Sequence, residues 1–297
     1  MGNKKMCGIL CILGATVAYA LVPSFSFLAF GVGVETETVL FNKFFYASIL
    51  IWAYIFFKKI PFRVSKEAFP VLAAIVISYI GLATTLYLAY DYISGSLATI
   101  ISFIFPAFVL AVEMIRGTEP VRLLKIFAIL LAIVGLGFTV WNPDMQVHFL
   151  GVLFALLCAV CYAVYTLCLA SKKLADFHSI ATAGYVLLGS TVFNFFRCMI
   201  SGKPFLALAP EQLGCMLMLS VICAFSAILL FCIGVKIIGA SNASIINTFE
   251  PVFACVFGFL FVGDEITLGM VIGGILVVTA VLIANMPDRK KLPPQSK

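Results

Sequence analysis

The sequence predicts an all-α integral membrane protein whose ten transmembrane helices form two inverted five-helix repeats around a central cavity. Three observations support this fold class: an apolar composition, ten apolar stretches of membrane-spanning length, and a second half that repeats the first. Of the 297 residues, 63% are hydrophobic and 11% are charged, whereas a soluble domain carries about 25% charged residues. The bilayer is therefore the expected solvent.

Ten apolar stretches are separated by charged or turn-forming residues, and about 20 apolar residues span the hydrocarbon core of a bilayer. Because backbone groups in lipid must satisfy their own hydrogen bonds, the stretches are expected to be helices. A transmembrane β-barrel would instead show shorter segments of alternating polarity. The stretches cover residues 7–30, 38–57, 69–89, 93–114, 123–141, 149–170, 180–200, 213–235, 241–262 and 268–285.

An internal repeat relates the two halves of the chain. Residues 98–108 (ATIISFIFPAF) and 243–253 (ASIINTFEPVF) are identical at five of eleven positions, and the Tyr-Ala pair at 19–20 recurs at 162–163. Each repeat holds five helices, and because five is odd, the second copy enters the membrane from the opposite side. The expected units are a first repeat at residues 1–145, a second repeat at 146–288 and a basic cytoplasmic tail at 289–297.

The basic residues set the expected orientation. With the N-terminus inside, 16 of the 19 Lys and Arg residues fall in inner segments, two fall in outer segments, and Lys43 lies within a helix. Cytoplasmic loops are enriched in Lys and Arg, so both termini are expected in the cytoplasm, with the chain in the cell (plasma or inner) membrane. The net charge of +6 follows from this asymmetry and does not indicate a nucleic-acid partner.

The fourth predicted helix of each repeat carries small or polar residues, a central proline, and an apolar stretch that ends in an acidic loop. In the second repeat this pattern reads Phe249-Glu250-Pro251-Val252-Phe253 and then Gly263-Asp264-Glu265. Over essentially the whole chain, the sequence resembles the drug/metabolite transporter (DMT) superfamily, in particular the EamA-type exporters. The resemblance implies that four helices of each repeat surround a cavity, while the fifth helices (123–141 and 268–285) lie at the periphery.

Glu250 is the first candidate for a substrate-binding residue. It falls about ten residues into an apolar stretch, and ionisable groups at such depth usually face a cavity or a partner. Asn247 lies three residues earlier, on the same helical face. Pro251, like its repeat partner Pro106, is a predicted hinge or kink because proline removes a backbone donor. The alternative for Glu250 is a structural anchor, hydrogen-bonded between helices and away from substrate.

Lys43 is the second candidate. It stands where an arginine is often found early in the second helix of the family, and a lysine cannot offer a carboxylate the bidentate fork of a guanidinium. The alternative is that Lys43 extends to the outer membrane interface. A pair between Lys43 and Glu250 would neutralise both charges, which the sequence alone does not establish.

Four tyrosines within the predicted spans and one serine complete the candidate set. A tyrosine hydroxyl in lipid seeks a partner, and its ring can stack on a planar or amphipathic solute. Helix packing is the alternative role for each tyrosine. The serine is the repeat partner of Asn247. These candidates are Tyr19, Tyr87, Tyr162, Tyr165 and Ser102.

Together with the resemblance, these features predict a secondary transporter that exports amino acids or related small metabolites by alternating access. The alternative is a multidrug or cation efflux carrier of the same superfamily. An intramembrane enzyme is disfavoured because His148 and His178 fall on opposite predicted faces and the chain has no HExxH or GxSxG motif. There is no Walker A motif for ATP coupling and no segment typical of a selectivity filter.

No cofactor or metal is expected. The ten cysteines lie in apolar runs, where they behave as small hydrophobic residues. Cys158 and Cys161 form a CxxC motif, but no histidine or second cysteine pair is near in sequence to complete a metal site. The expected partners are a small-molecule solute and the lipid bilayer, and the oligomeric state stays open.

Overall fold

The computed structural model describes residues 2–116, 123–140, 148–206, 209–239, 243, 246–247 and 249–284. All regular structure within these ranges is helical, including a short 3₁₀ turn, η1, and a π-helical segment, η2. The elements are α1 (Gly2–Gly31), α2 (Thr36–Phe57), α3 (Phe69–Tyr90), α4 (Gly95–Ser102), α5 (Phe105–Ile115), α6 (Leu123–Val140), α7 (Phe149–Leu169), η1 (Lys172–Leu174), α8 (Ser179–Ser201), α9 (Pro210–Met218), η2 (Leu219–Ser226), α10 (Ala227–Ile238), α12 (Glu250–Phe261) and α13 (Leu268–Ala284).

In the part of the chain that the structure describes, seven helical stretches are long and apolar enough to cross a bilayer, and three shorter apolar helices lie within α6, α12 and α13. Large apolar side chains such as Phe57 and Ile200 are more than four-fifths exposed, which suits a surface that faces lipid. The predicted class, a multi-pass all-α membrane protein, is confirmed. The predicted tail at 289–297 lies outside the described residues.

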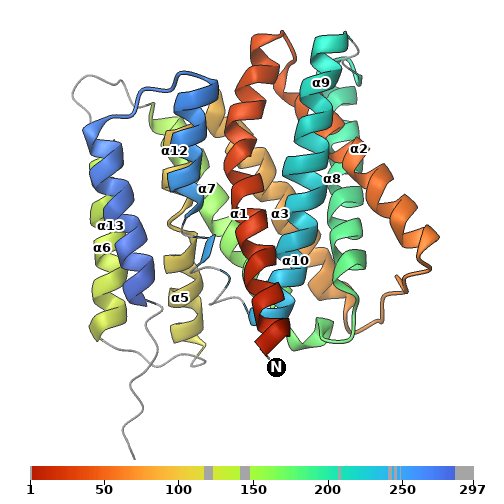
Figure 1. Ribbon diagram of the computed structural model, residues 1–297, viewed down its shortest axis with the longest axis horizontal. Coiled ribbons are helices and arrows are strands. Elements are labelled where there is room, and N and C mark those ends of the chain that lie inside the picture. Colours follow the sequence, from red (N-terminus) through yellow and green to blue (C-terminus); the bar gives the residue numbers. More distant parts are fainter. Residues whose placement is uncertain are drawn as a thin grey trace, which may run out of the picture.

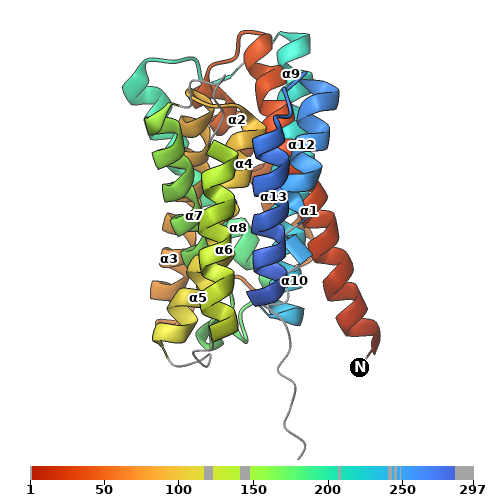
Figure 2. The ribbon, with the colours of Figure 1, turned by 90° about the vertical axis from the view of Figure 1, so that its left-hand side faces the viewer.

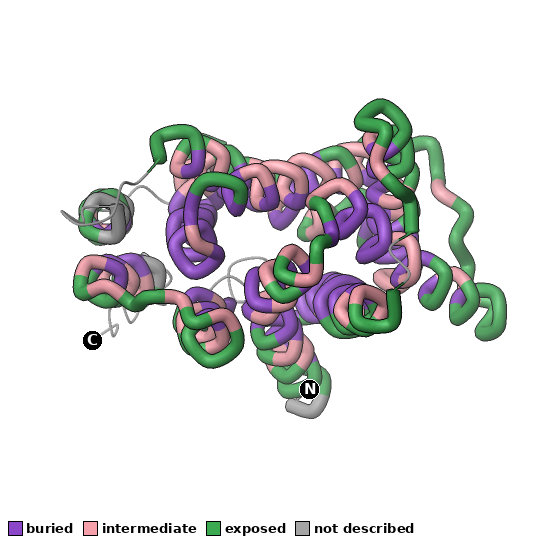
Figure 3. The backbone as a smooth tube through the Cα atoms, turned by 90° about the horizontal axis from the view of Figure 1, so that it is seen from above, coloured by how far each residue is buried: buried purple, intermediate pink, exposed green. Residues whose placement is uncertain are grey.

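The helices pack in pairs that join segments far apart in the sequence. The most extensive contacts are α3 with α7, α1 with α10, α2 with α8, and α6 with α13. The α6–α13 pair stands at one edge of the molecule, where the resemblance places the fifth helices (Figures 1 and 2). Seen from above, buried positions face the interior of the bundle and exposed positions face outward (Figure 3).

Two predicted spans are interrupted. The span predicted at 93–114 consists of two helices, because α4 ends at Ser102 and α5 begins at Phe105 with Pro106 in its first turn. Likewise α12 begins at Glu250, with Pro251 in its first turn. Proline is tolerated in a first turn, where its missing N–H would have no helical acceptor. Glu250 therefore lies at a helix N-terminus, where the helix dipole favours a carboxylate, rather than in the middle of a continuous helix.

The span predicted at 213–235 is longer and less regular than expected. It runs as α9, η2 and α10 without interruption, and the Ser226 hydroxyl donates to the Val221 carbonyl five residues earlier, at 2.7 Å. Within η2, Ser220 donates across to the Asn42 carbonyl of α2 at 3.1 Å. π-Helical segments inside α-helices occur frequently at functional sites.

Close backbone approach joins α6 to α13 and gives a test of this pairing. A Cβ atom added at Gly135 would lie 2.9 Å from the Gly273 carbonyl oxygen, whereas one added at Gly274 would meet nothing within 4 Å. We expect Gly135→Ala to lower the free energy of unfolding by about 1–3 kcal/mol, because the two backbones must separate. Gly274→Ala is the matched control. Thermal unfolding in detergent measures both, and equal midpoints for the two variants would contradict the packing.

Candidate functional site

A cavity of about 50 Å³ lies inside the bundle, where six helices converge. Its walls come from α1, α2, α3, α4, α7 and α12, together with Phe103 at the break after α4. The lining residues come from both halves of the chain, from Tyr19 in the first half to Glu250 in the second. Both halves therefore contribute to one cavity. The polar or ionisable side chains in the lining are Tyr19, Lys43, Tyr79, Tyr87, Tyr90, Thr99, Ser102, Cys158, Tyr162 and Glu250.

The structure brings six of the eight predicted binding residues to this cavity: Glu250, Lys43, Tyr19, Tyr87, Tyr162 and Ser102. Asn247 and Tyr165 do not line it, and both are fully buried. Asn247 lies behind Glu250, and the Tyr165 hydroxyl is 3.6 Å from the sulfur of Cys232. The geometry gives these two residues supporting positions around the lining.

Asn247 holds the Glu250 carboxyl group in place. Its side-chain nitrogen donates to Glu250 Oε2 at 2.6 Å and to the Tyr162 hydroxyl at 2.9 Å, which uses both N–H groups. Its oxygen lies 2.8 Å from the hydroxyl of Thr16 on α1. A buried amide with all its donors engaged fixes its neighbours, so Glu250 is oriented by contacts that reach α1 and α7.

Lys43 faces the cavity and not the membrane interface. Its side chain is 3% exposed, so the alternative of extension to the outer interface is wrong. The ammonium nitrogen lies 5.2 Å from the ring centre of Tyr87 and 5.3 Å from that of Phe44, within cation–π range. Among the described residues it makes no ion pair. Lys43 and Glu250 therefore share a cavity without neutralising each other.

Tyrosines form half of the polar lining, and their hydroxyl groups differ in how many partners they have. The Tyr87 hydroxyl is 2.6 Å from Ser26 Oγ, and the ring of Tyr162 stacks on Phe105 at 3.9 Å. The buried hydroxyl of Tyr19 makes no hydrogen bond with any described residue. A buried hydroxyl without a partner is costly, which suits a group that bonds to water or to a bound solute.

The lining of α3 was only partly anticipated by the sequence. Tyr79, Leu82, Ala83, Leu86 and Tyr90 join Tyr87 on one face, at helical spacing. Given Tyr87, this spacing indicates Tyr90, one turn later, as a second residue that could stack on a solute. The same signal could have identified Tyr79. Thr99 had no comparable signal, because a threonine in a helix commonly bonds its own preceding turn, as Thr99 does to the Gly95 carbonyl at 2.9 Å.

The cavity is small. A buried water needs about 10–15 Å³ of such space, so about 50 Å³ holds a few waters and no larger solute. Lys43 is buried, whereas Glu250 is partly exposed. A larger solute fits only if the helices around these two side chains separate.

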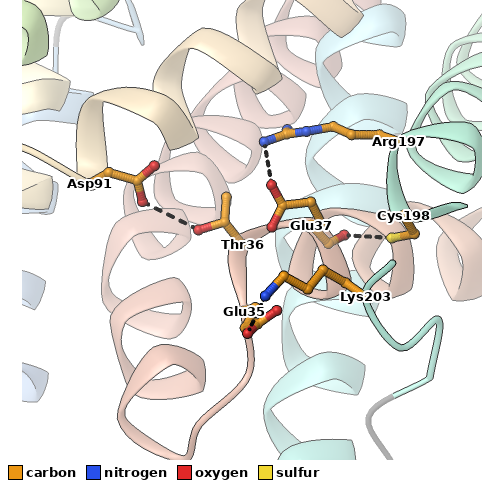
Figure 4. A network of polar contacts seen from close by, with 7 residues as sticks. All are labelled: Glu35, Thr36, Glu37, Asp91, Arg197, Cys198 and Lys203. Atoms are coloured by element: carbon orange, nitrogen blue, oxygen red, sulfur yellow. Dashed lines mark hydrogen bonds and ion pairs between the residues drawn. The ribbon is translucent and has the colours of Figure 1, made fainter. Parts of the chain in front are cut away.

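An ion-pair cluster, formed by Glu35, Glu37, Arg197 and Lys203, joins the two halves at the end of the bundle opposite the N-terminus (Figures 1 and 4). Arg197 Nη2 lies 3.0 Å from Glu37 Oε1, and Lys203 Nζ lies 2.8 Å from Glu35 Oε1. The first pair is about one-fifth exposed and the second nearly half exposed. The cluster connects the α1–α2 turn and the start of α2 to the end of α8 and the segment that follows it.

Further hydrogen bonds reinforce this closure. Thr38 Oγ1 donates to the Pro204 carbonyl at 2.7 Å, and Asn42 Nδ2 donates to the Phe205 carbonyl at 2.8 Å. Asp91, at the end of α3, lies 3.4 Å from Thr36 Oγ1 (Figure 4), and partial burial raises the pKa of its carboxyl group. The hydrogen bond to Glu35 raises the pKa of Lys203.

The acidic loop after α12 also carries a contact. Asp264 Oδ2 accepts a hydrogen bond from Ser96 Oγ at 2.6 Å, which ties this loop to the first turn of α4. Asp264 is therefore partly covered, whereas its neighbour Glu265 is exposed. Gly258 allows this approach, since a Cβ atom there would lie 2.4 Å from Ser96 Oγ.

The chain is 24% identical to an uncharacterised transporter, YcbK, of Bacillus subtilis, over 91% of this chain and 90% of that protein. It is also 24% identical to an uncharacterised inner membrane transporter, YicL, of Salmonella typhimurium, over 77% and 78%. One solved crystal structure, 16% identical, superposes with a TM-score of 0.70 over 93% of this chain and 96% of that one, which shows a shared fold.

A family assignment covers nearly all of the chain. The EamA-like transporter family matches twice, at residues 6–141 and at residues 149–286. The two matched ranges contain every residue that lines the cavity. The chain therefore belongs to the EamA-like transporter family, within the drug/metabolite transporter superfamily, and is a multi-pass membrane transporter by family.

Proposed function

We propose that the chain is a secondary carrier that exports amino acids or related small metabolites without ATP. The observation that carries this proposal is that Lys43 and Glu250 face one cavity and are not paired with each other. Charges at membrane depth are costly unless compensated. A zwitterionic solute supplies both partners, its carboxylate to the Lys43 ammonium and its ammonium to the Glu250 carboxylate. The export direction and the amino-acid class follow the resemblance to EamA-type exporters.

The architecture that we propose for this carrier is ten helices in two inverted five-helix repeats, with both termini cytoplasmic. The pattern of helix contacts supports it. If α1 corresponds to α7, and α3 to the stretch that ends in α10, exchanging the halves turns the α1–α10 contact into the α3–α7 contact. The same exchange leaves the α2–α8 and α6–α13 pairs unchanged. The two family matches, one in each half, agree with this arrangement.

The proposed mechanism is alternating access, in which the halves rock about the shared cavity. The small cavity volume supports a state closed around the site, and the ion-pair cluster supports closure at the end opposite the N-terminus. By the distribution of basic residues, we place that end outside. Pro106 and Pro251, each in the first turn of a helix beside the cavity, are the proposed hinges.

The second candidate is a multidrug or cation efflux carrier. The aromatic walls and Glu250 favour a cationic solute, whereas Lys43 opposes one by like-charge repulsion. A single measurement separates the two candidates: flux into proteoliposomes of reconstituted protein, tested with amino acids, nucleosides and cationic drugs in parallel. Saturable uptake of a zwitterion that shows counterflow and is recovered chemically unchanged supports the proposal and argues against catalysis. Saturable uptake of cations alone would overturn it.

Lys43→Gln tests the assigned contact with the carboxylate. We expect the KM for zwitterionic solutes to rise about 10–100-fold, because a hydrogen bond to a charged group contributes about 1.5–3 kcal/mol. Solutes without a carboxylate should show little change. Lys5→Gln, at an exposed position on α1, is the control. An equal rise of KM for both classes of solute would contradict the assignment.

A further inference from the structure

A surface groove lies away from the proposed transport site and shares no lining residue with it. It is a groove of about 820 Å³ between α3 and α8, and apart from Tyr185 and Gly189 every residue that lines it is aliphatic or phenylalanine. It follows α3 from Phe69 to Ile80 and α8 from Tyr185 to Phe196. Close packing forms its floor, where a Cβ atom at Gly189 would lie 2.3 Å from Val76 Cγ1.

The length of the groove matches one leaflet of a bilayer. The eleven helical steps from Phe69 to Ile80 extend about 16 Å at roughly 1.5 Å per residue. Half of a hydrocarbon core about 30 Å thick is about 15 Å. A chain that starts at one membrane surface therefore ends near the midplane, as an acyl chain does.

One end of the groove has the character of a membrane interface. Tyr185 donates a hydrogen bond to the Phe62 carbonyl at 2.9 Å, and the ring of Trp52 lies 5.5 Å from that of Tyr185. Tyrosine and tryptophan are enriched at the level of lipid headgroups. This end therefore lies at headgroup depth, and Val64 and Phe69 form its mouth.

Several cations that have no acidic partner among the described residues lie near the same mouth. The loop between α2 and α3 carries four exposed basic residues and one acid, Glu67, and Arg63 and Lys66 flank the lining residue Val64. None of the four makes an ion pair with an acid among the described residues. The segment η1, which contacts α3, adds Lys172 and Lys173, both exposed. Each basic residue near an anionic membrane surface strengthens attraction to anionic headgroups.

We propose that this groove is a binding site for one anionic phospholipid, whose acyl chain lies between α3 and α8 and whose phosphate contacts Arg63 and Lys66. Each feature of the groove matches one part of that lipid. The apolar lining and the length of one leaflet suit an acyl chain, and the aromatic residues lie at headgroup depth. The cations, which have no acidic partner among the described residues, suit the phosphate. The site is separate from the Lys43–Glu250 cavity and does not depend on the identity of the transported solute.

The test is a titration of delipidated, purified full-length protein with phosphatidylglycerol and, separately, with phosphatidylcholine. Native mass spectrometry counts the bound lipid, and thermal unfolding measures the shift of Tm. We expect one phosphatidylglycerol to bind more tightly than phosphatidylcholine by about tenfold or more, given two phosphate-facing charges. The double variant Arg63→Gln/Lys66→Gln should remove this preference. Lys4→Gln/Lys5→Gln, which removes two exposed cations at the N-terminus, should retain it.

A second pair of variants tests the groove itself. Ala73→Trp fills the lining, whereas Ile133→Trp places the same side chain on α6, at an exposed position outside the groove. Neither substitution changes the charge of the protein. We expect Ala73→Trp to lose the bound lipid and Ile133→Trp to keep it. The proposal is overturned if the two lipids bind equally, if both charge variants behave alike, or if glycerol phosphate alone produces the full Tm shift. The charge variants decide the question if Ala73→Trp does not fold.

Discussion

Replacing Glu250 by glutamine is expected to abolish the pH dependence of transport while leaving the fold intact. The substitution keeps the side-chain length and an oxygen that can accept the Asn247 hydrogen bond, but it removes the group that binds and releases a proton. Glu250 lines the cavity that we propose as the solute site. In that proposal, a proton on its carboxyl group and a solute ammonium compete for the same oxygens, and exchange of one for the other couples solute export to proton entry.

The measurement is counterflow and gradient-driven uptake in proteoliposomes over pH 5.5 to 8.5, with a solute that saturates the wild-type protein. For Glu250→Gln we expect accumulation driven by a pH gradient to fall at least tenfold, on the scale of other positioned proton-transfer groups. Glu211→Gln, at an exposed position in the first turn of α9, controls for loss of a carboxylate. If Glu250→Gln retained the full pH response, proton coupling through this residue would be excluded.

The same experiment separates the two roles open to Glu250. A structural anchor would lower stability when it is replaced and would leave the pH profile of the remaining transport unchanged. A coupling group would change the profile with little effect on Tm. Asn247→Ala complements this test, because it removes the donor that orients Glu250 and its link to Thr16. We expect that variant to keep a pH response with a shifted midpoint.

The sequence predicted those parts of the site whose residues are costly in lipid. Glu250 and Lys43 were identifiable because an ionisable side chain within an apolar stretch needs a reason to be there. Their arrangement was not identifiable, since burial of Lys43 over two aromatic rings depends on how α2 rotates against α3. The sequence around a lysine near a helix end is the same whether its side chain extends to the membrane interface or turns toward the interior of the bundle.

Backbone irregularity was predicted only where proline marks it. Pro106 and Pro251 indicated a kink, and helices do begin anew at both. The π-helical segment at Leu219–Ser226 had no such mark. Its residues are apolar or small and suit any helix, and the irregularity depends on tertiary contacts such as Ser220 with the Asn42 carbonyl. Contacts between distant segments, such as Arg197 with Glu37, were equally invisible in one sequence, because complementary charges on two different helices do not show which residues pair.

Breaking the Arg197–Glu37 pair is expected to open the cavity to the side where the ion-pair cluster lies. The pair is about one-fifth exposed and joins the two halves. A charged hydrogen bond of this kind contributes about 1.5 kcal/mol, so its loss shifts a closed–open equilibrium roughly tenfold. Lys203→Gln removes the more exposed pair with Glu35 and should change the equilibrium less than threefold, because exposed pairs contribute little.

Cys158 reports this opening directly. It lines the cavity and is 1% exposed, so a membrane-impermeant thiol reagent reaches it only when the halves separate. We expect Arg197→Gln to raise the labelling rate of Cys158 about tenfold from the cluster side, with no increase from the opposite side. Peptide mass spectrometry distinguishes Cys158 from the other cysteines, and Cys158→Ala sets the background.

The charge exchange Glu37→Arg/Arg197→Glu should restore slow labelling, because attraction between the two positions is regained whichever residue carries which sign. Faster labelling from both sides would mean general loosening of the bundle. Equal labelling rates in Arg197→Gln and Lys203→Gln would mean that the Arg197–Glu37 pair does not hold the cavity closed. The hydrogen bonds from Thr38 and Asn42 would then be the contacts that hold α2 against the segment after α8.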